Sequence, residues 1–201
     1  MLRKKEVLIV VAHPDDEVIW AGGTLLKMDS SKFNKTLIVL CRAKDTDRYP
    51  KFRKVAEFLK AESHIFDLDD AEEGDYKQIP SEEIIKKILQ VIKNKKFDIL
   101  YTHGKEGEYG HVRHLDINKA VNEMLDKKLL SAKKVFYFSY HKMKNNFQNY
   151  AIYNSNADKL IKLKEPYLSM KKKLITDIYG FQKGGFEEIS SSNIEAFDIK
   201  K

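Results

Sequence analysis

Short β-rich runs alternate with longer helical stretches along this chain of 201 residues. The clearest run, VLIVV at residues 7–11, is continuous and mostly β-branched, as in strands that are buried on both faces of a parallel sheet. A helical pattern follows at residues 16–28. Because this alternation is typical of layered α/β domains, we expect a Rossmann-like fold in which helices flank a mostly parallel sheet.

The same periodicity predicts further strands and helices in alternation. We expect strands at residues 36–41, 64–68, 98–102 and 135–138, and helices at residues 49–61, 81–92, 117–125 and 167–179. Ser81, which precedes two glutamates, is the expected N-cap of its helix. Residues 145–156 are rich in asparagine and predict a connection.

The length and composition fit a single domain. With 42% hydrophobic and 33% charged residues, the chain has the composition of a globular protein. We expect one domain over residues 1–201, with its core at about 6–140 and a helical extension at about 155–201. The apolar run at residues 7–12 is too short for a membrane span or a secretory signal, and the single cysteine, Cys41, suits a reducing compartment. We therefore expect a cytoplasmic protein.

The net charge of +7 raises the question of nucleic-acid binding. Only five of the 37 basic residues are arginines, whose forked side chain fits phosphate or guanine, and the rest are lysines spread among 30 acidic residues. Dispersed lysines are typical of a solvated surface. We expect a small-molecule ligand and no nucleic-acid partner.

Two clusters of polar residues follow predicted strands. Residues 12–17, AHPDDE, come directly after the first strand, and residues 107–114, GEYGHVRH, come shortly after the strand that ends at Thr102. Since open parallel sheets bind ligands at the carboxyl ends of their strands, we expect both clusters to lie in one cleft. His103 is close enough to the second cluster to line this cleft and contact a substrate there.

The clusters contain ligand types that zinc prefers. A metal ion that activates water needs about three protein ligands and an open position, which His13, one of two aspartates (Asp15 or Asp16), and one or both of His111 and His114 would supply. The other aspartate is then available as a base. These residues could also have only structural roles. Acids at the start of a helix stabilise the helix dipole, and a single histidine after a strand is commonly a surface residue.

Together, the clusters resemble a known family. Residues 12–17, residues 22–25 (GGTL) and the pattern from Thr102 to His114 are similar to those of the zinc-dependent N-acetylglucosaminyl-phosphatidylinositol de-N-acetylases, the PIG-L or LmbE-like family. The resemblance covers about residues 7–139 and implies a zinc ion, or iron(II) or cobalt(II) in its place. By motif position, it implies metal ligands at His13, Asp16 and His114, a general base at Asp15, oxyanion stabilisation by a protonated His111 with help from Tyr109, and a substrate contact by Arg48, with Arg53 as the alternative.

The resemblance also implies an activity. Metal-activated water would remove the N-acetyl group from an N-acetylglucosamine-type amino sugar or glycoconjugate. The alternatives are an amidase or deacetylase of a thiol-sugar conjugate, a nucleotide sugar or a secondary metabolite, and a non-catalytic sugar-binding domain with the same fold. We expect residues 45–50, 72–80 and 145–156 to select the substrate.

One position departs from the family pattern. Many relatives have an acid or an amide just before the second histidine, where it orients the first imidazole, but this chain has Arg113. Asp116 is then a candidate for the group that sets the charge of His111, and the assignment stays open at this point.

Overall fold

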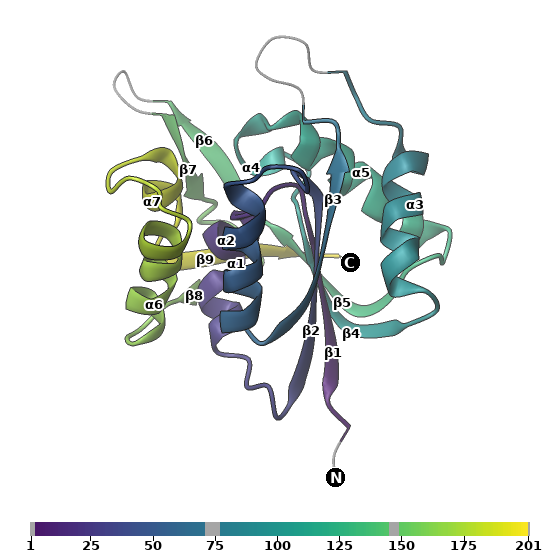
Figure 1. The fold of residues 1–201 in the computed structure, drawn as a ribbon, viewed down its shortest axis with the longest axis horizontal. Helices are drawn as coiled ribbons and strands as arrows, with labels where there is room; N and C mark the ends of the chain where they lie inside the picture. The colour runs from purple at the N-terminus through teal and green to yellow at the C-terminus, as the bar shows by residue number, and fades with distance from the viewer. Residues whose placement is uncertain (1–2, 71–76, 145–148, 201) are drawn as a thin grey trace.

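The computed structural model describes residues 3–70, 77–144 and 149–200 (Figure 1). Its centre is a seven-stranded sheet with the strand order β3-β2-β1-β4-β5-β9-β8. Five of these strands run parallel: β1 (Lys5–Val11), β2 (Phe33–Cys41), β3 (Ala61–Leu68), β4 (Lys96–Thr102) and β5 (Ser131–Phe138). This arrangement confirms the Rossmann-like α/β fold.

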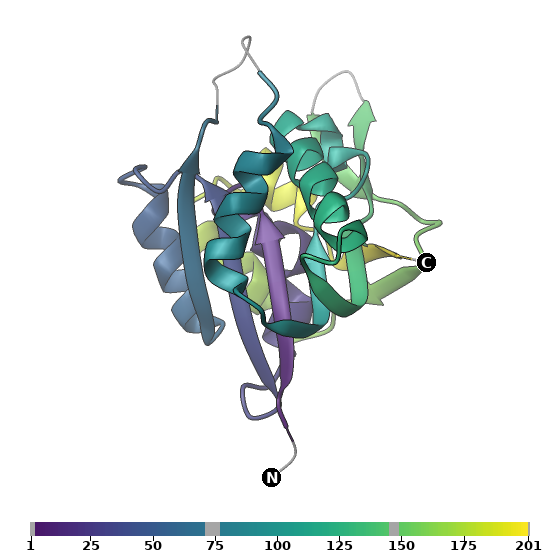
Figure 2. The ribbon, with the colours of Figure 1, turned by 90° about the vertical axis from the view of Figure 1, so that its right-hand side faces the viewer.

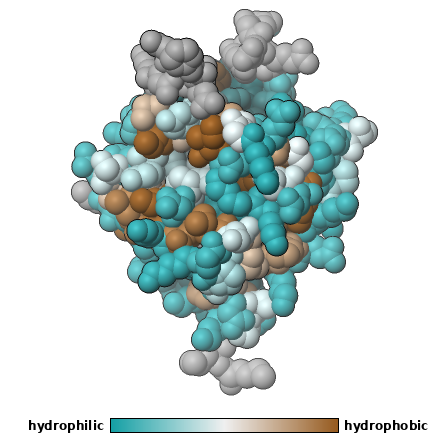
Figure 3. All heavy atoms as spheres, turned by 90° about the vertical axis from the view of Figure 1, so that its left-hand side faces the viewer, coloured by the Kyte–Doolittle hydropathy of each residue, from teal (hydrophilic) through white to brown (hydrophobic). Residues whose placement is uncertain are grey.

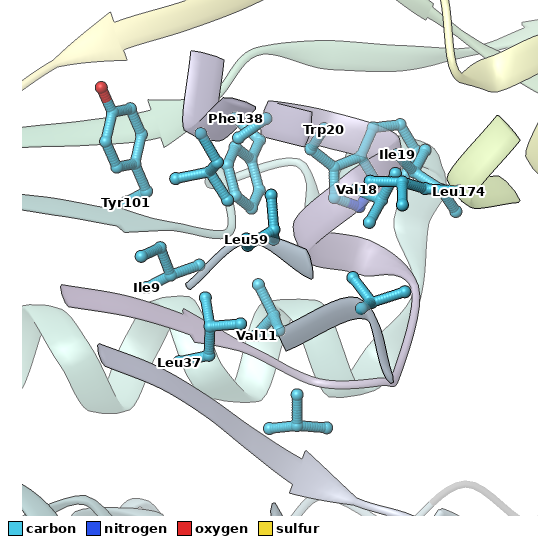
Figure 4. Packing of buried hydrophobic residues seen from close by; sticks show 14 of the residues in the cluster. Ile9, Val11, Val18, Ile19, Trp20, Leu37, Leu59, Tyr101, Phe138 and Leu174 are labelled. Atoms are coloured by element: carbon cyan, nitrogen blue, oxygen red, sulfur yellow. The ribbon is translucent and has the colours of Figure 1, made fainter. Parts of the chain in front are cut away.

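Helices cover both faces of the parallel part of the sheet. One face carries α1 (Asp16–Leu26) and α2 (Arg48–Phe58), and the opposite face carries α3 (Ser81–Ile92) and α5 (Val112–Asp126) (Figures 1 and 2). Alternate residues of β1 divide between the two cores. Ile9 and Val11 belong to the core on the α1 side, seen in Figure 4, whereas Leu8 and Val10 belong to the core on the α3 side. All four side chains are fully buried, as expected for a central strand.

Two element boundaries differ from the prediction. β3 begins at Ala61, where we expected helix, because α2 ends at Phe58 and Lys60 adopts a left-handed φ of 51°. α3 begins at Ser81, so Pro80 occupies the N-cap position, and no side chain in the described part of the chain caps this end. Pro80 already has the extended ψ of 134° that the residue before a helix requires.

The C-terminal part is more than the expected helical extension. It contains α6 (Tyr167–Lys173), the π-helical turn η1 (Leu174–Ile178) and α7 (Phe186–Ser190), together with two strands, β8 (Lys159–Lys162) and β9 (Ile194–Ile199). β9 pairs antiparallel with both β5 and β8 and thereby extends the central sheet. The expected asparagine-rich connection includes half of a hairpin formed by β6 (Tyr140–Lys144) and β7 (Asn149–Tyr153), between which residues 145–148 lie outside the described chain.

Neither β8 nor β9 has the pattern that predicts a strand. β8 has only four residues, most of them exposed, and β9 carries the charged Glu195 at a fully buried position. The side of the molecule with α6 and α7 has a mostly hydrophilic surface interrupted by groups of hydrophobic residues (Figure 3). Within residues 3–70, 77–144 and 149–200, no helix combines the length and apolar character needed to cross a bilayer.

The C-terminal part packs closely on α1. A Cβ atom on Gly23 would lie 2.4 Å from Leu163 Cδ1, so a larger residue does not fit without a shift. Glu195 accepts hydrogen bonds from the backbone N–H groups of Gly23 and Thr24 at 2.7 and 2.8 Å, and it pairs with the buried Lys171 of α6 at 3.0 Å. The C-terminal part is thereby anchored to the helix that begins at Asp16.

Candidate active site

The two polar clusters meet at the carboxyl ends of β1 and β4. These strands are neighbours: Val10 pairs with Thr102, whose Oγ1 donates a hydrogen bond to the Val10 carbonyl at 2.9 Å. The chain leaves β1 toward β2, on the opposite side from β4, so this is the point in the sheet where parallel α/β folds form a ligand crevice. Segments far apart in the sequence therefore share one site.

The residues expected to bind a metal converge in this crevice. His13 Nδ1 lies 3.3 Å from Asp16 Oδ2, and His114 Nε2 lies 3.4 Å from the same oxygen. The ring centroids of His13 and His114 are 5.4 Å apart. His111 belongs to the same group, because one ring nitrogen each of His13, His111 and His114 lies within 4.8 Å of the other two.

The carboxylates around His114 favour a positive charge at its ring, whether a proton or a metal ion carries it. Its Nδ1 bonds to Glu108, while its buried Nε2 has no hydrogen-bond partner among the described residues and faces the Asp16 carboxylate. Burial lowers the pKa of His114, but the charges of Asp16 and Glu108 outweigh burial and raise that pKa to about 10.

The spacing also fits a metal ion. Tetrahedral ligands at about 2.0–2.1 Å from zinc are about 3.3–3.4 Å apart. The two distances to Asp16 Oδ2, 3.3 Å from His13 and 3.4 Å from His114, match this separation. These two separations suit His13, Asp16 and His114 as ligands of one metal ion.

Glu108 supports this group from behind. On the short helix α4 (Gly107–Gly110), its carboxylate bonds to Nδ1 of both His103 and His114 and accepts the Gly104 N–H at 2.8 Å. The other nitrogen of His103 accepts the Ala12 N–H at 2.9 Å, and the His103 side chain is fully buried. The expectation that His103 lines the cleft is therefore wrong, because both ring nitrogens are used in holding the two clusters together.

Asp15 is held in an unusual conformation at the pocket. Its φ of 127° is rare for a residue with a side chain, and its N–H donates to the buried Glu17 carboxylate at 3.1 Å. Arg48 Nη1 donates to Asp15 Oδ2 at 2.6 Å. Burial and the Asp16 charge raise the pKa of Asp15 to about 7, although the Arg48 charge acts to lower it. Asp15 can therefore take up and release a proton near neutral pH.

His111 differs from its expected protonation state. It occupies the N-cap of α5, where its Nδ1 accepts the Arg113 N–H at 3.2 Å. Burial and the neighbouring His114 and His13 lower the pKa of His111 to about 3. The acceptor role of Nδ1 and the lowered pKa favour a neutral ring with its proton on Nε2, whereas the resemblance implies a protonated one. Asp116 does not orient this ring, since its Oδ2 accepts a hydrogen bond from Arg113 Nη1 at 2.9 Å.

A pocket of about 130 Å³ opens onto these groups. Arg48 lines it, as expected, and places its guanidinium 4.4 Å from the ring centroid of Phe181. Arg53 instead donates to Ser63 Oγ at 2.6 Å and is not a lining residue. The lining residues are His13, Asp15, Asp16, Ile19, Trp20, Arg42, Arg48, Tyr109, His111, Phe186 and Glu187.

Sequence reasoning missed several residues of the site. Glu108 lies between two histidines in the sequence, and that spacing could have identified it. Phe186 and Glu187 line the pocket from a five-residue helix that carries no recognisable motif. Of the segments expected to select the substrate, residues 45–50 supply Arg48, whereas residues 72–76 and 145–148 lie outside the described chain.

Known structures share this fold. The conserved protein TT1542 from Thermus thermophilus superposes with a TM-score of 0.69 at 14% identity over 96% of this chain and 94% of that protein. N,N'-diacetylchitobiose deacetylase from Pyrococcus horikoshii superposes with a TM-score of 0.64 at 16% identity, and the match covers 98% of this chain and 84% of the deacetylase. The 4-carboxy-2-hydroxymuconate hydratase GalB from Pseudomonas putida KT2440 superposes with a TM-score of 0.66 at 15% identity, and the match covers 98% of this chain and 95% of the hydratase.

Sequence comparisons identify the family. An uncharacterized protein of Acanthamoeba polyphaga mimivirus is 25% identical over 136 residues, which cover 60% of this chain but only 58% of that protein. The family described as GlcNAc-PI de-N-acetylase, PIG-L, matches residues 8–125, a span that includes both polar clusters. Because this match extends over more than half of its residues, the chain belongs to the PIG-L family.

Proposed function

We propose that this protein is a metal-dependent hydrolase that removes the N-acetyl group from an N-acetylglucosamine-type amino sugar or glycoconjugate. The observation that carries the proposal is the convergence of His13 Nδ1 and His114 Nε2 on one oxygen of Asp16, beside a carboxylate whose pKa is near 7. Membership of the PIG-L family and the fold shared with a chitobiose deacetylase support the same reaction.

Three residues would hold the metal: His13, Asp16 and His114. When bound there, zinc or a similar ion supplies Lewis acidity, which activates water near neutral pH and polarises a carbonyl group. The carboxylate of Asp16 is suited to this because it remains ionised. Burial acts to raise its pKa, but the charges of and hydrogen bonds from its histidine neighbours keep that pKa well below the usual value. The charge of the metal ion would take over this role when the histidines bind it as neutral ligands.

Asp15 would act as the general base and then as the general acid. Its carboxylate takes a proton from the attacking water and returns it to the departing amine, which is most efficient for a group whose pKa is near the working pH. The Arg48 contact at 2.6 Å keeps this carboxylate at the pocket wall.

His111 would stabilise the negative charge that develops on the acetyl carbonyl oxygen. The neutral ring uses Nδ1 as the acceptor for the Arg113 N–H, so its proton is on Nε2. A single donor of this kind contributes about 3–4 kcal/mol to the transition state of acyl transfer. Tyr109, which lines the pocket next to His111, would assist in binding the carbonyl.

The walls of the pocket suit a sugar ring. Tyr109 and Phe186 supply apolar ring surfaces, and Arg42 and Glu187 supply polar groups for hydroxyls. Small-molecule sites combine an apolar lining with a few polar groups in this way.

Paired variants test the metal and base roles separately. Acetate and free amine should be measured with N-acetylglucosamine and N,N'-diacetylchitobiose, together with bound zinc. We expect His114→Ala to lose zinc and activity, and Asp15→Asn to keep zinc but lose about 10²–10⁴-fold in kcat. His64→Ala, at a partly exposed histidine of β3, is the control and should match the wild type. Equal zinc content and equal rates in all three variants would refute the assignment.

A hydratase is the second candidate, because the fold is shared with GalB. Hydration also needs an activated water and a base, and the pocket contains two arginines, Arg42 and Arg48, that could bind a carboxylate. Turnover of an unsaturated dicarboxylate without acetate release from any N-acetyl sugar would favour this candidate over deacetylation.

A further inference from the structure

The residue before His114 cannot orient an imidazole by accepting a hydrogen bond, because Arg113 has donors only. The ring of His13 is instead contacted by a carboxylate from another part of the chain. Asp70, just beyond the end of β3, places its Oδ1 2.9 Å from His13 Nε2. The Asp70 side chain is mostly buried, with 11% of its surface exposed.

This contact determines which nitrogen of His13 is available. With the ring proton on Nε2 and donated to Asp70, the lone pair is on Nδ1, the atom that lies 3.3 Å from Asp16 Oδ2. A carboxylate bonded to the far nitrogen of a metal-binding histidine fixes its tautomer and ring orientation and increases its basicity. Glu108 makes the corresponding contact to His114.

Asp70 is itself held by an arginine from the end of β2. Arg42 Nε donates to Asp70 Oδ2 at 2.6 Å, so each carboxylate oxygen has its own partner. The Arg42 side chain is 41% exposed, which leaves this ion pair partly accessible to water and therefore weak.

Arg113 holds the chain next to Asp70 from the opposite side. Its Nε donates to the Asp69 carbonyl at 2.5 Å, and its Nη1 donates to the Lys77 carbonyl at 2.8 Å. Asp116 completes the group, because its Oδ2 accepts from Arg113 Nη1 and from the Ile79 N–H. The N-terminal part of α5 thus bonds to the chain before and after residues 71–76, which lie outside the described part.

The contacts made at position 113 require an arginine side chain. The side chain is only 1% exposed and bonds to two carbonyls and one carboxylate from two different nitrogens. Lysine has a single nitrogen and cannot reproduce this fork. Loss of one partner of a buried ion pair leaves an uncompensated charge, so the pair with Asp116 favours a single position of the Arg113 side chain.

We propose that Arg113 is a positioning residue for the metal site: by holding Asp69 against α5, it keeps Asp70 bonded to His13 and so presents His13 Nδ1 to the metal. The proposal rests on the metal site of the proposed function. Within the described part of the chain, the Arg113 side chain makes no hydrogen bond or ion pair with His13, Asp16 or His114 and is not among the pocket-lining residues, so it acts through its bond to the Asp69 carbonyl and thus through Asp70.

Zinc affinity, measured by competition with a chromophoric chelator, tests this directly. We expect Asp70→Ala and Arg113→Lys each to weaken zinc binding by about 10–100-fold. Asp70→Asn, which keeps an acceptor, should lose less. The double variant should lose little more than the worse single variant, since both residues act through one contact. Arg53→Lys, at an exposed arginine bonded to Ser63, is the matched control.

The outcomes separate the two proposals. If His13→Ala and His114→Ala lose zinc but Asp70→Ala and Arg113→Lys bind it like the wild type, the positioning role is wrong and the metal site stands. If His13→Ala and His114→Ala also bind zinc normally, the proposed function itself fails. Thermal unfolding of each variant identifies any that is misfolded, in which case Asp70→Asn, the mildest change, decides.

Discussion

The candidate site, which comprises the pocket and the residues behind it, is built from two regions of very different character. The site floor, which we define as His13, Asp15, Asp16, Glu108 and His114, follows β1 and β4 in the parallel part of the sheet. The site wall, defined as Phe181, Phe186 and Glu187, comes from the C-terminal part, beyond residues 8–125 that match the family. The groups proposed to react and the groups proposed to contact the rest of a substrate therefore come from different parts of one chain.

The two regions are held by different interactions. In the floor, the carboxylates are held by hydrogen bonds and ion pairs. Glu108 bonds to two imidazoles and a backbone N–H, Asp16 bonds to the His13 N–H and to the Trp20 indole, and Asp15 bonds to Arg48. In the wall, the phenylalanines make ring contacts, with Phe186 4.7 Å from Tyr109 between centroids. We therefore expect substitutions in the floor to disturb the metal and the fold, and substitutions in the wall to disturb substrate binding.

The largest effect should follow from Glu108→Gln. In the wild type Oε2 accepts from both His103 and His114, and Oε1 accepts the Gly104 N–H. In glutamine one of these two positions becomes an NH₂ group, which cannot accept, so at least one buried donor loses its partner. We expect zinc affinity to fall by about 10–100-fold and the melting temperature to fall as well. Glu106→Gln, at a side chain that is 70% exposed, is the control. Indistinguishable melting curves and zinc affinities for the two variants would break the distinction between floor and wall.

A smaller effect, at the boundary of the two regions, should follow from Arg48→Met. Arg48 lowers the pKa of Asp15, which is about 7, so removing the cation raises that pKa. A general base works only when deprotonated, so the acidic limb of kcat/KM should move to higher pH. Arg48→Lys, which keeps the charge, should move it less. A pH profile unchanged in Arg48→Met would mean that Asp15 is not the base.

The smallest effect should follow from Phe186→Ala in the wall. Loss of one aromatic contact, about 0.5–1.5 kcal/mol, corresponds to an increase in KM of about 2- to 12-fold, with kcat and bound zinc near wild-type values. Phe58→Ala, at a phenylalanine of α2 that is 48% exposed, is the matched control. If kcat falls as steeply as in Asp15→Asn, the wall contributes to the chemical step and the comparison needs revision.

The sequence predicted the floor better than the wall for a physical reason. A strand buried on both faces leaves an apolar run such as residues 7–11, and the polar residues that follow it are then recognisable as the end of a strand. The position of His13 and Asp16 follows from this. His103 was misassigned because a histidine that lines a cleft and one that bonds two backbone segments look alike in a sequence.

The wall could not be predicted because its position depends on tertiary contacts. Phe186 and Glu187 lie on α7, which packs against β7, α1 and η1, and the chain then continues into β9, whose buried Glu195 stands where a strand pattern requires an apolar residue. Asp70 was hidden for a similar reason. It lies in an acidic stretch that is typical of a solvated loop, and its contacts with His13 and Arg42, together with the Arg113 bond to the neighbouring Asp69 carbonyl, distinguish it.

The buried Lys171–Glu195 pair has a consequence for redesigning this protein. Since Glu195 bonds to two amides in the middle of α1, and α1 begins with Asp16, the segment carrying Phe186 cannot be exchanged for a relative's segment as a free cassette. A chimera must contain Glu195 and Lys171 together, because either one alone would be a buried charge without a partner next to α1. It must also keep glycine at position 23, where a larger residue would clash with Leu163.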